Sequence, residues 1–309
     1  MKNRKVLVVL GGTSGEREIS LASGTACIKA LKKMGHKVST FDPKKKTLSL
    51  IDANKTDVIF NALHGKDGED GVAQSYFEYL RIPYTHSGVI SSYNAMNKKI
   101  SKEIFKKNKI KSPKYFVLRK KNYNKSKLKT YIKRKKIKFP IVVKPISEGS
   151  SIGVKICKNL DKLDKSSISL FKKYEELIFE TYIGGQEIQV AVINGVPLGA
   201  IELKPKREFY DYKAKYFKSA RTKHIMPANL KKDKYREALK IAKQAHQALG
   251  CNGITRSDFK FFKNQFYLLE INTQPGMTSL SLVPEIAKYK GISFENLVKK
   301  ILLNASLNK

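Results

Sequence analysis

The chain has 309 residues, of which 41% are hydrophobic and 28% are charged. This composition is ordinary for a globular protein of about two domains, and it excludes a disordered chain and a collagen-like repeat. Lys and Arg number 62 against 26 Asp and Glu, which gives a net charge of +36. Such a charge is compatible with nucleic acid, an anionic membrane or anionic small molecules as partners. Because the lysines recur in nearly every segment, however, the pattern favours solvated surfaces.

Cysteines and apolar runs indicate the compartment. Cys27, Cys157 and Cys251 lie far apart without CxxC spacing, which indicates neither a disulfide framework nor a zinc site and is typical of a reducing compartment. The apolar run at residues 6–10 is too short for the core of a signal peptide, and no stretch approaches the length of a membrane span. We therefore expect a soluble cytoplasmic protein without membrane contact.

The first third of the chain alternates short apolar runs with helical patterns. Strands are predicted at residues 5–10, 36–42 and 57–63, and helices at 20–34 and 71–80. This βαβα order indicates a parallel sheet with helices on its faces. Ligands of open α/β sheets bind beyond the carboxyl ends of the strands, which is where the polar segments 11–18 and 64–71 are predicted to lie.

The rest of the chain divides into two further regions. The second has Lys-rich helices and strands that include residues 115–118, 139–145, 154–157 and 177–183. The third contains two predicted hairpins, one with a turn at Asn194-Gly195 and one between 253–262 and 265–273, and it ends in a short amphipathic helix at 293–303.

The second hairpin carries candidate metal ligands. Because side chains alternate along a strand, Asp258 shares a face with Arg256, and Glu270 shares a face with Asn272. Leu269, on the opposite face, is predicted to enter the core. Two adjacent strands can thus direct two carboxylates and an amide to one point, a donor set that suits Mg²⁺. The alternative is a pair of polar faces on a surface hairpin.

A Gly-Ser loop follows a buried strand and is a candidate phosphate site. Lys144 stands at the end of that apolar strand, and the sequence SEGSSIG at 147–153 follows it. Glycines let backbone N–H groups approach phosphates, and lysine supplies a point charge. The Walker spacing is absent, and such a loop alone is usually a flexible turn. Together with the hairpin carboxylates, it favours a nucleoside triphosphate.

Three further segments have alternative interpretations. FYDYKAKY at 209–216 could stack on the bases of single-stranded nucleic acid or order over an active site. GGTSGERE at 11–18 lacks the GxGxxG fingerprint of a dinucleotide site, so an NAD dehydrogenase is disfavoured; Glu16 either caps a helix or pairs with a substrate ammonium. A lone His64 is more often structural than catalytic, but the acids and glycines beside it favour function.

Taken together and in this order, seven segments resemble the D-alanine–D-alanine ligase family of the ATP-grasp superfamily. They are GGTSGEREIS, ALHGKDGEDG, PYTHSGV, VVKPISEGSSIG, FYDYKAKY, RSDF and YLLEINTQPGMTSLSLVP. The resemblance implies an α/β protein of three domains, with an open parallel sheet at 1–96 and two α+β lobes at 97–183 and 184–309 that clamp ATP. It also implies the ligation of two D-alanines through an acyl phosphate, for peptidoglycan precursor synthesis.

The same resemblance implies roles for the residues that bind the first D-alanine. Glu16 would hold its ammonium group, and Ser150 and Tyr216 would be the hydrogen-bonded partners of Glu16. His64 would lie near its carboxyl group. The tyrosine at position 216 accompanies D-alanine as the second substrate, whereas relatives that use D-lactate lack it.

The remaining roles concern the transition state, the second substrate and ATP. Arg256 and the backbone of Gly276 would stabilise the oxyanions, and Ser281 and Leu282 would hold the second carboxylate. The resemblance implies contacts to ATP for Lys98, Lys144, Glu180, Tyr182, Ile183, Glu187 and Lys215. Asp258, Glu270 and Asn272 would hold two Mg²⁺, which Mn²⁺ could replace.

The implied partners are ATP and D-alanine, with a homodimer, no nucleic acid and no membrane. One alternative is the same fold with D-lactate or D-serine as acceptor. Another is a nucleic-acid-binding protein, favoured by the net charge of +36. Acids at the predicted strand ends disfavour it, because a phosphate backbone would be repelled there.

Overall fold

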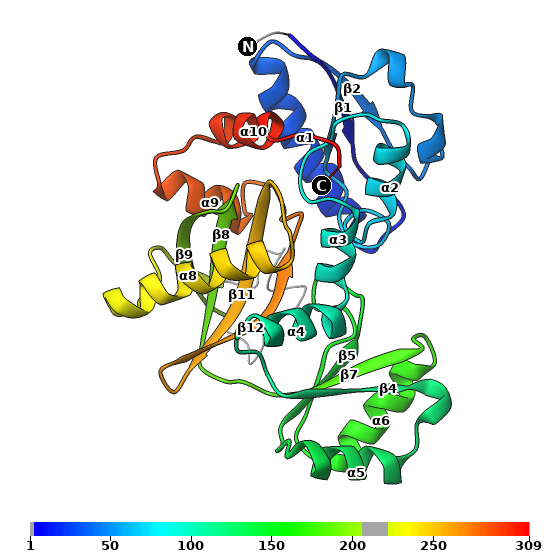
Figure 1. The fold of residues 1–309 in the computed structure, drawn as a ribbon, viewed down its shortest axis with the longest axis vertical. Helices are drawn as coiled ribbons and strands as arrows, with labels where there is room; N and C mark the ends of the chain where they lie inside the picture. The colour runs from blue at the N-terminus through cyan, green and yellow to red at the C-terminus, as the bar shows by residue number, and fades with distance from the viewer. Residues whose placement is uncertain (1–2, 206–221, 309) are drawn as a thin grey trace.

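A computed structural model describes residues 3–205 and 222–308 (Figure 1). It contains an α/β arrangement of three sheets, each formed by a different stretch of the chain. The first sheet is parallel and the other two are antiparallel. The predicted fold class is therefore confirmed.

The first sheet has the order β2-β1-β3, from Lys37–Phe41, Lys5–Val9 and Val58–Asn61. Strands β1 and β3 are almost entirely buried, as their continuous apolar runs predict. Three helices accompany this sheet: α1 (Arg17–Lys33), α2 (Val72–Tyr79) and α3 (Val89–Met96). The sequence predicted the first two helices but not α3.

The central sheet has the order β4-β7-β5-β6. Its strands are Tyr115–Arg119, Glu176–Thr181, Ile141–Pro145 and Lys155–Cys157. Helices α5 (Lys125–Lys135) and α6 (Leu160–Phe171) cover one face, as Figure 1 shows at the bottom of the molecule. Their apolar side chains close a core with Phe116, Val143 and Phe179. The opposite face is left for the functional site.

The third sheet has the order β10-β9-β8-β11-β12. Its strands are Lys223–Ile225, Val196–Lys204, Gln186–Ile193, Ile254–Phe262 and Gln265–Asn272. Helix α8 (Lys232–Ala248) lies across one face (Figure 1). Helix α4 (Lys98–Lys107) joins the same core through Phe105. Both predicted hairpins form, and both turn residues of each, including Lys263 and Asn264, have positive φ.

The last two helices connect the third sheet to the first. α9 (Leu282–Tyr289) packs on β9, and α10 (Phe294–Leu303) packs on α1 (Figure 1). One hydrophobic cluster therefore includes Val6 of β1, Ala191 of β8 and Leu297 of α10. A second link is a β-bridge between Tyr84 and Ser306. Shared packing of this kind fixes the first sheet against the third, so side chains from both can form one site.

Candidate functional site

The β11–β12 hairpin places its polar side chains as the alternation of strand residues predicts. Asp258 lies directly opposite Glu270, and Arg256 lies directly opposite Asn272. Directly opposed residues of an antiparallel pair point to the same face. The guanidinium of Arg256 donates to both oxygens of Asp258, with Nε 2.7 Å and Nη2 2.9 Å away. Two carboxylates, an amide and a guanidinium thus share one side of the hairpin.

The position of Leu269 differs from the sequence prediction. It was predicted to enter the core, but the register shifts after Asp258 so that Phe259 lies opposite Leu268. Leu269 is the extra residue of this β-bulge, and it lines a cavity instead. A bulge adds one residue to one strand, so it resets the alternation of faces and directs both Leu269 and Glu270 away from the core.

That cavity lies between the central sheet and the third sheet. It is lined by eight of the residues that were expected to hold ATP or metal: Lys98, Lys144, Glu180, Tyr182, Ile183, Glu187, Asp258 and Glu270. They come from α4, β5, β7, the β7–β8 connection, β8, β11 and β12. The seventh residue predicted to contact ATP, Lys215, lies outside the described residues, as does Tyr216.

Buried charges within this cavity are paired. Glu180 is buried, and its two carboxylate oxygens lie 3.1 Å from Lys102 Nζ and 3.0 Å from Lys144 Nζ. Burial alone would raise the pKa of Glu180, but the two ammonium groups outweigh it and lower that pKa. Burial lowers the pKa of Lys102, which is fully enclosed. An ionised Glu180 is therefore held in one position by two cations, and Lys102 was not among the predicted site residues.

Lys98 is positioned by the start of α4. The side chain of Asn97 accepts hydrogen bonds from Lys99 N and Ile100 N, so it caps the helix and makes Lys98 its first residue. Lys98 Nζ donates to Glu148 O at 2.5 Å and lies 3.7 Å from Glu270 Oε2. The cap thus directs a buried ammonium group between the Gly-Ser loop and the hairpin.

The Gly-Ser loop reaches the first sheet through Glu16. Ser150 has positive φ, and its hydroxyl donates to Glu16 Oε1. Both side chains are buried. A Cβ at Gly149 would come within 2.7 Å of Glu16 Oε2, so a side chain at this position would displace the Glu16 carboxylate. Arg17 fixes the segment before α1 by donating to Gly12 O and to Asp42. The structure therefore brings together the predicted pair Glu16 and Ser150.

His64 is placed differently from the other predicted residues. Its Nε2 lies 3.1 Å from Ser23 Oγ, which also accepts from Met277 N. Burial, together with the charge of Arg256, lowers the pKa of His64 to about 4, so the imidazole is neutral at pH 7. His64 lines a cavity beside segment 11–14, at the ends of the first-sheet strands. In this structure it joins the first sheet to the segment after β12.

Arg256 lines two further cavities. One also contains Ser150, Lys98, Glu270 and Asn272. The other, of about 240 Å³, contains the three predicted residues Gly276, Ser281 and Leu282. Ser281 directly precedes helix α9, and its hydroxyl lies 2.8 Å from Thr278 Oγ1. The arginine therefore lies between the first-substrate residues and those expected to hold the second substrate.

Two buried groups at the boundary were missed by sequence reasoning. Burial and the neighbouring Glu16 raise the pKa of Glu69 well above its usual range. Glu69 lines the cavity that contains Ser150 and Arg256 and accepts a hydrogen bond from Gly65 N. Gln274 donates to Leu63 O and accepts from Asn61 Nδ2 at 2.8 Å. The local signal for both is their place in polar loops that follow strands: Glu69 comes after Gly68 in the loop between β3 and α2, and Gln274 comes before Pro275, two residues after β12.

The donor set of the hairpin fits a magnesium ion. Asp258, Glu270 and Asn272 supply carboxylate and amide oxygens, the hard ligands that Mg²⁺ takes alongside phosphate oxygens. Across residues 3–205 and 222–308, no cluster of three His, Cys, Asp or Glu side chains could hold a metal by itself. A magnesium site on the hairpin would thus combine the two carboxylates with the Asn272 amide, and its remaining ligands would come from the substrate or water.

Two antiparallel sheets that bring lysines and carboxylates to one cavity, beside a parallel-sheet domain, define an ATP-grasp enzyme. Residues 104–303 match the family model described as D-ala D-ala ligase C-terminus, and residues 43–87 match the one described as D-ala D-ala ligase N-terminus. The chain belongs to the D-alanine–D-alanine ligase family. The resemblance seen in the sequence is thereby confirmed.

Proteins similar to this chain match it over nearly its whole length. The D-alanine–D-alanine ligase of Pelagibacter ubique (strain HTCC1062) is 54% identical over 307 residues, which cover 99% of either chain. The ATP complex of D-alanine–D-alanine ligase from Bacillus anthracis is 32% identical, with a TM-score of 0.85 over 98% of this chain and 97% of that one. The VanG D-Ala:D-Ser ligase from Enterococcus faecalis is 27% identical, with a TM-score of 0.85 over 97% and 98%.

Proposed function

We propose that this chain joins two D-alanine molecules into D-alanyl-D-alanine at the expense of ATP, which becomes ADP and phosphate, as a step toward peptidoglycan precursors. The observation that carries the proposal is the position of Arg256, which lines both the cavity with Ser150 and Glu270 and the cavity with Gly276 and Ser281. A carboxyl group activated at the first cavity would meet an amine held in the second.

The first half-reaction transfers the γ-phosphoryl group. A carboxylate oxygen of the first D-alanine attacks the γ-phosphorus, the bond to ADP breaks, and an acyl phosphate forms. Lys98 and Lys144 would bind phosphate oxygens, and Glu16 would hold the ammonium of the first D-alanine. Bound Mg²⁺, on Asp258, Glu270 and Asn272, would neutralise charge on the phosphoryl oxygens.

The second half-reaction forms the peptide bond. The amine of the second D-alanine, after losing a proton, attacks the acyl carbon, and phosphate leaves with the C–O bonding electrons. Arg256 and the N–H of Gly276, residues that both line the second cavity, would stabilise the oxyanion. Ser281 and the N–H groups at the start of α9 would hold the second carboxylate, because a helix N-terminus attracts anions.

The fold alone does not distinguish between D-alanine, D-serine and D-lactate as the acceptor substrate. The VanG D-Ala:D-Ser ligase has the same fold, with a TM-score of 0.85. The choice of D-alanine rests on Tyr216 and on the names of the more similar relatives. D-Lactate and D-serine are therefore the acceptors to test against it.

The decisive experiment measures ADP and product together. Purified protein receives ATP and Mg²⁺ with D-alanine alone, with L-alanine alone, or with D-alanine plus D-lactate or D-serine. We expect ADP release only with D-alanine and one dipeptide per ADP by mass spectrometry. ADP release without a ligated product would contradict the ligase proposal, and a mixed product in preference to the dipeptide would contradict the acceptor.

The domain boundaries, the oligomeric state and the location of the protein extend this proposal. We infer domain boundaries at residues 96/97 and 183/184, supported by the confinement of each sheet to one segment. We infer a homodimer and a cytoplasmic location from the family resemblance. In the described part of the chain, no helix combines the length and apolarity that crossing a membrane requires. Light scattering of the purified protein tests the dimer, and Mn²⁺ in place of Mg²⁺ tests the exchange of metals.

A further inference from the structure

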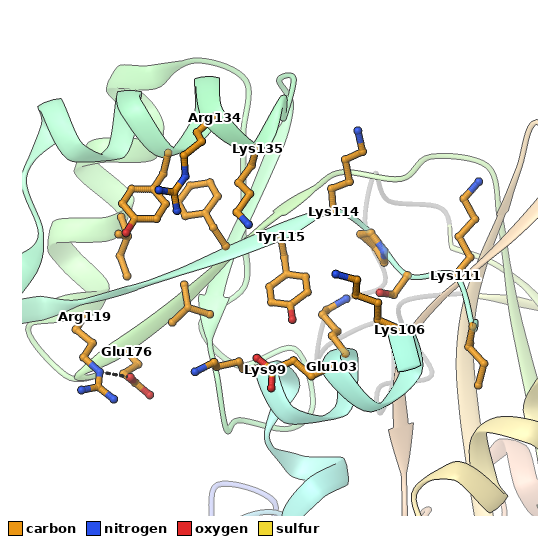
Figure 2. Close-up of a pocket in the computed structure, with 18 of the residues that line it drawn as sticks. Lys99, Glu103, Lys106, Lys111, Lys114, Tyr115, Arg119, Arg134, Lys135 and Glu176 are labelled. Atoms are coloured by element: carbon orange, nitrogen blue, oxygen red, sulfur yellow. Dashed lines mark hydrogen bonds and ion pairs between the residues drawn. The ribbon is translucent and has the colours of Figure 1, made fainter. Parts of the chain in front are cut away.

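A groove of about 1160 Å³ lies between α4, the connection 108–114, β4 and α5, outside the reaction cavities (Figure 2). Ten of its 21 lining residues are Lys or Arg and two are Glu. In the whole chain, Lys and Arg make up only 62 of 309 residues. Cations are therefore more than twice as frequent in the lining of the groove as in the whole chain.

Most of these cations are open to a partner. Arg119 is paired with Glu176 at 2.5 Å, and Lys102 is paired with Glu180. For Lys106, Lys114 and Lys135, the described residues place no carboxylate within ion-pair distance. Figure 2 shows Lys106 on the α4 side of β4, Lys135 on the α5 side and Lys114 at one end. The positive charge therefore surrounds the strand from both sides.

The floor of the groove is a sheet edge with which no further strand of residues 3–205 and 222–308 pairs. β4 is the terminal strand of the central sheet, and all five of its residues line the groove. Thr181 N donates to Lys114 O, and Lys120 N donates to Glu175 O. Because hydrogen bonding alternates along an antiparallel strand, Tyr115, Val117 and Arg119 direct their main-chain groups away from β7. An extended chain can pair with such an edge.

Two of the three aromatic rings that line the groove, Phe116 and Tyr131, are unsuited to stacking on bases, and the third, Tyr115, has Lys102 Nζ 5.7 Å from its ring centroid. Tyr131 stacks on Phe116 on one face, with centroids 5.5 Å apart, and Arg134 lies 4.8 Å above its ring. Phe116 stacks in turn on Phe179. Single-stranded nucleic acid binds such grooves largely through free aromatic faces, and the stacked pair of Phe116 and Tyr131 offers few of them.

We propose that this groove binds an extended acidic peptide segment of a partner protein, which pairs with the edge of β4 while its carboxylates contact the surrounding lysines. The occupant follows from two separate observations, since the unpaired main-chain groups require an extended peptide and the cations require acidic side chains. The strand has five residues. At a rise of about 3.4 Å per residue it accommodates a segment of roughly 17 Å. The groove adjoins the nucleotide cavity, since Pro113 lines both and Lys102 pairs with Glu180, but Lys106 and Lys135 have no role assigned in the ligase reaction.

Binding can be measured by fluorescence anisotropy with the full-length protein. The probe is a labelled peptide of alternating Glu and Val, and the control peptide has Pro in place of Val at the same charge. At about 0.15 M salt, where exposed charges are screened beyond about 8 Å, we expect the proline peptide to bind at least about tenfold more weakly, because it lacks the N–H groups that pair with an edge. Equal binding of the two peptides would overturn the β-pairing.

Matched protein variants locate the site. Lys106→Glu with Lys135→Glu reverses two exposed groove charges, and Lys240→Glu with Lys243→Glu reverses two exposed charges on α8. We expect the first pair to weaken binding about tenfold and the second less than about twofold, since only groove charges approach the peptide. Both should keep wild-type ligase turnover, which shows that they fold.

The other outcomes overturn the proposal. Equal weakening by both pairs would mean that the protein attracts acids through its net charge alone. No binding of the Glu-Val peptide would mean that the lysines only shield the edge from other strands. If a single-stranded RNA of equal charge binds more tightly and the groove variant abolishes that binding, the surface is a nucleic-acid site.

Discussion

The hydroxyl of Ser150 donates a hydrogen bond to Glu16 across 134 residues of sequence. The contact joins the Gly-Ser loop of the central sheet to the start of α1, the first helix of the parallel-sheet domain. Since both side chains are buried, a substitution of either residue should alter the predicted ammonium site. The relationship therefore offers a direct test of how the first substrate is held.

Ser150→Ala should weaken the use of D-alanine and leave ATP binding largely intact. A hydrogen bond to a charged group contributes about 1.5–3 kcal/mol, so we expect kcat/KM for D-alanine to fall by roughly tenfold to a hundredfold. ADP release as a function of D-alanine measures this, and Ser169→Ala, on the exposed side of α6, is the control. An unchanged KM and kcat would contradict the assignment of Ser150.

Glu270→Gln should reduce turnover by about a hundredfold or more, because a charged metal ligand becomes a neutral one. The side chain keeps its shape, so the hairpin should fold normally. Titrating Mg²⁺ at fixed ATP separates loss of metal affinity from loss of the fold, since excess Mg²⁺ should restore part of the activity. Wild-type activity at low Mg²⁺ would show that Glu270 is not a ligand.

Lys102→Met tests a residue that holds Glu180 in position without lining the nucleotide cavity. Its ammonium group lies 3.1 Å from Glu180 Oε1, and the side chain is fully buried. Removing it leaves Glu180 with Lys144 alone, so we expect KM for ATP to rise about tenfold while kcat changes little.

A rise in KM for ATP without a change in kcat distinguishes a positioning role of Lys102 from a general loss of stability. An equal fall in kcat, or a variant whose unfolding midpoint drops without any change in KM, would show that Lys102 only supports packing. Lys173→Met, in an exposed position after α6, serves as the control.

His246 should make folding sensitive to mild acid. It is buried beside Thr255 Oγ1 at 2.8 Å, and burial lowers its pKa to about 4. The unfolded chain has the ordinary pKa of about 6.5 and binds the proton first, so stability is lost as pH falls from 6.5 toward 4. Between pH 7 and 5 this amounts to about 2 kcal/mol.

The matching measurement is urea unfolding of the wild type and His246→Gln at pH 7, 6 and 5. We expect the variant to be less stable at pH 7 but to lose less stability on acidification, and the difference between the two proteins isolates this histidine from the carboxylates. Parallel pH profiles would contradict the buried neutral imidazole.

Strong local signals were sufficient for much of the fold. The buried strands of the first sheet and both hairpins lie where apolar runs and turn residues predict them. Helix α5 was not predicted, and it buries only Leu128, so it has little apolar periodicity. Helices α3 and α9 have eight residues each, too few for a helical period to stand out. The long helix α8 was also missed, although it buries Ala238, Ala242 and Ala245 in a regular stripe.

What the sequence determined by itself was chemistry: which residue types stand at strand ends, and a motif order that identifies the family. The tertiary structure decided which of these side chains come into contact. The bulge after Asp258 moved Leu269 out of the core, because one added residue reverses the alternation of faces. Arg256 adjoins two cavities, and Lys102 reaches Glu180, because separate segments pack together. Local patterns encode which face of an element is buried, whereas only packing decides which buried faces touch.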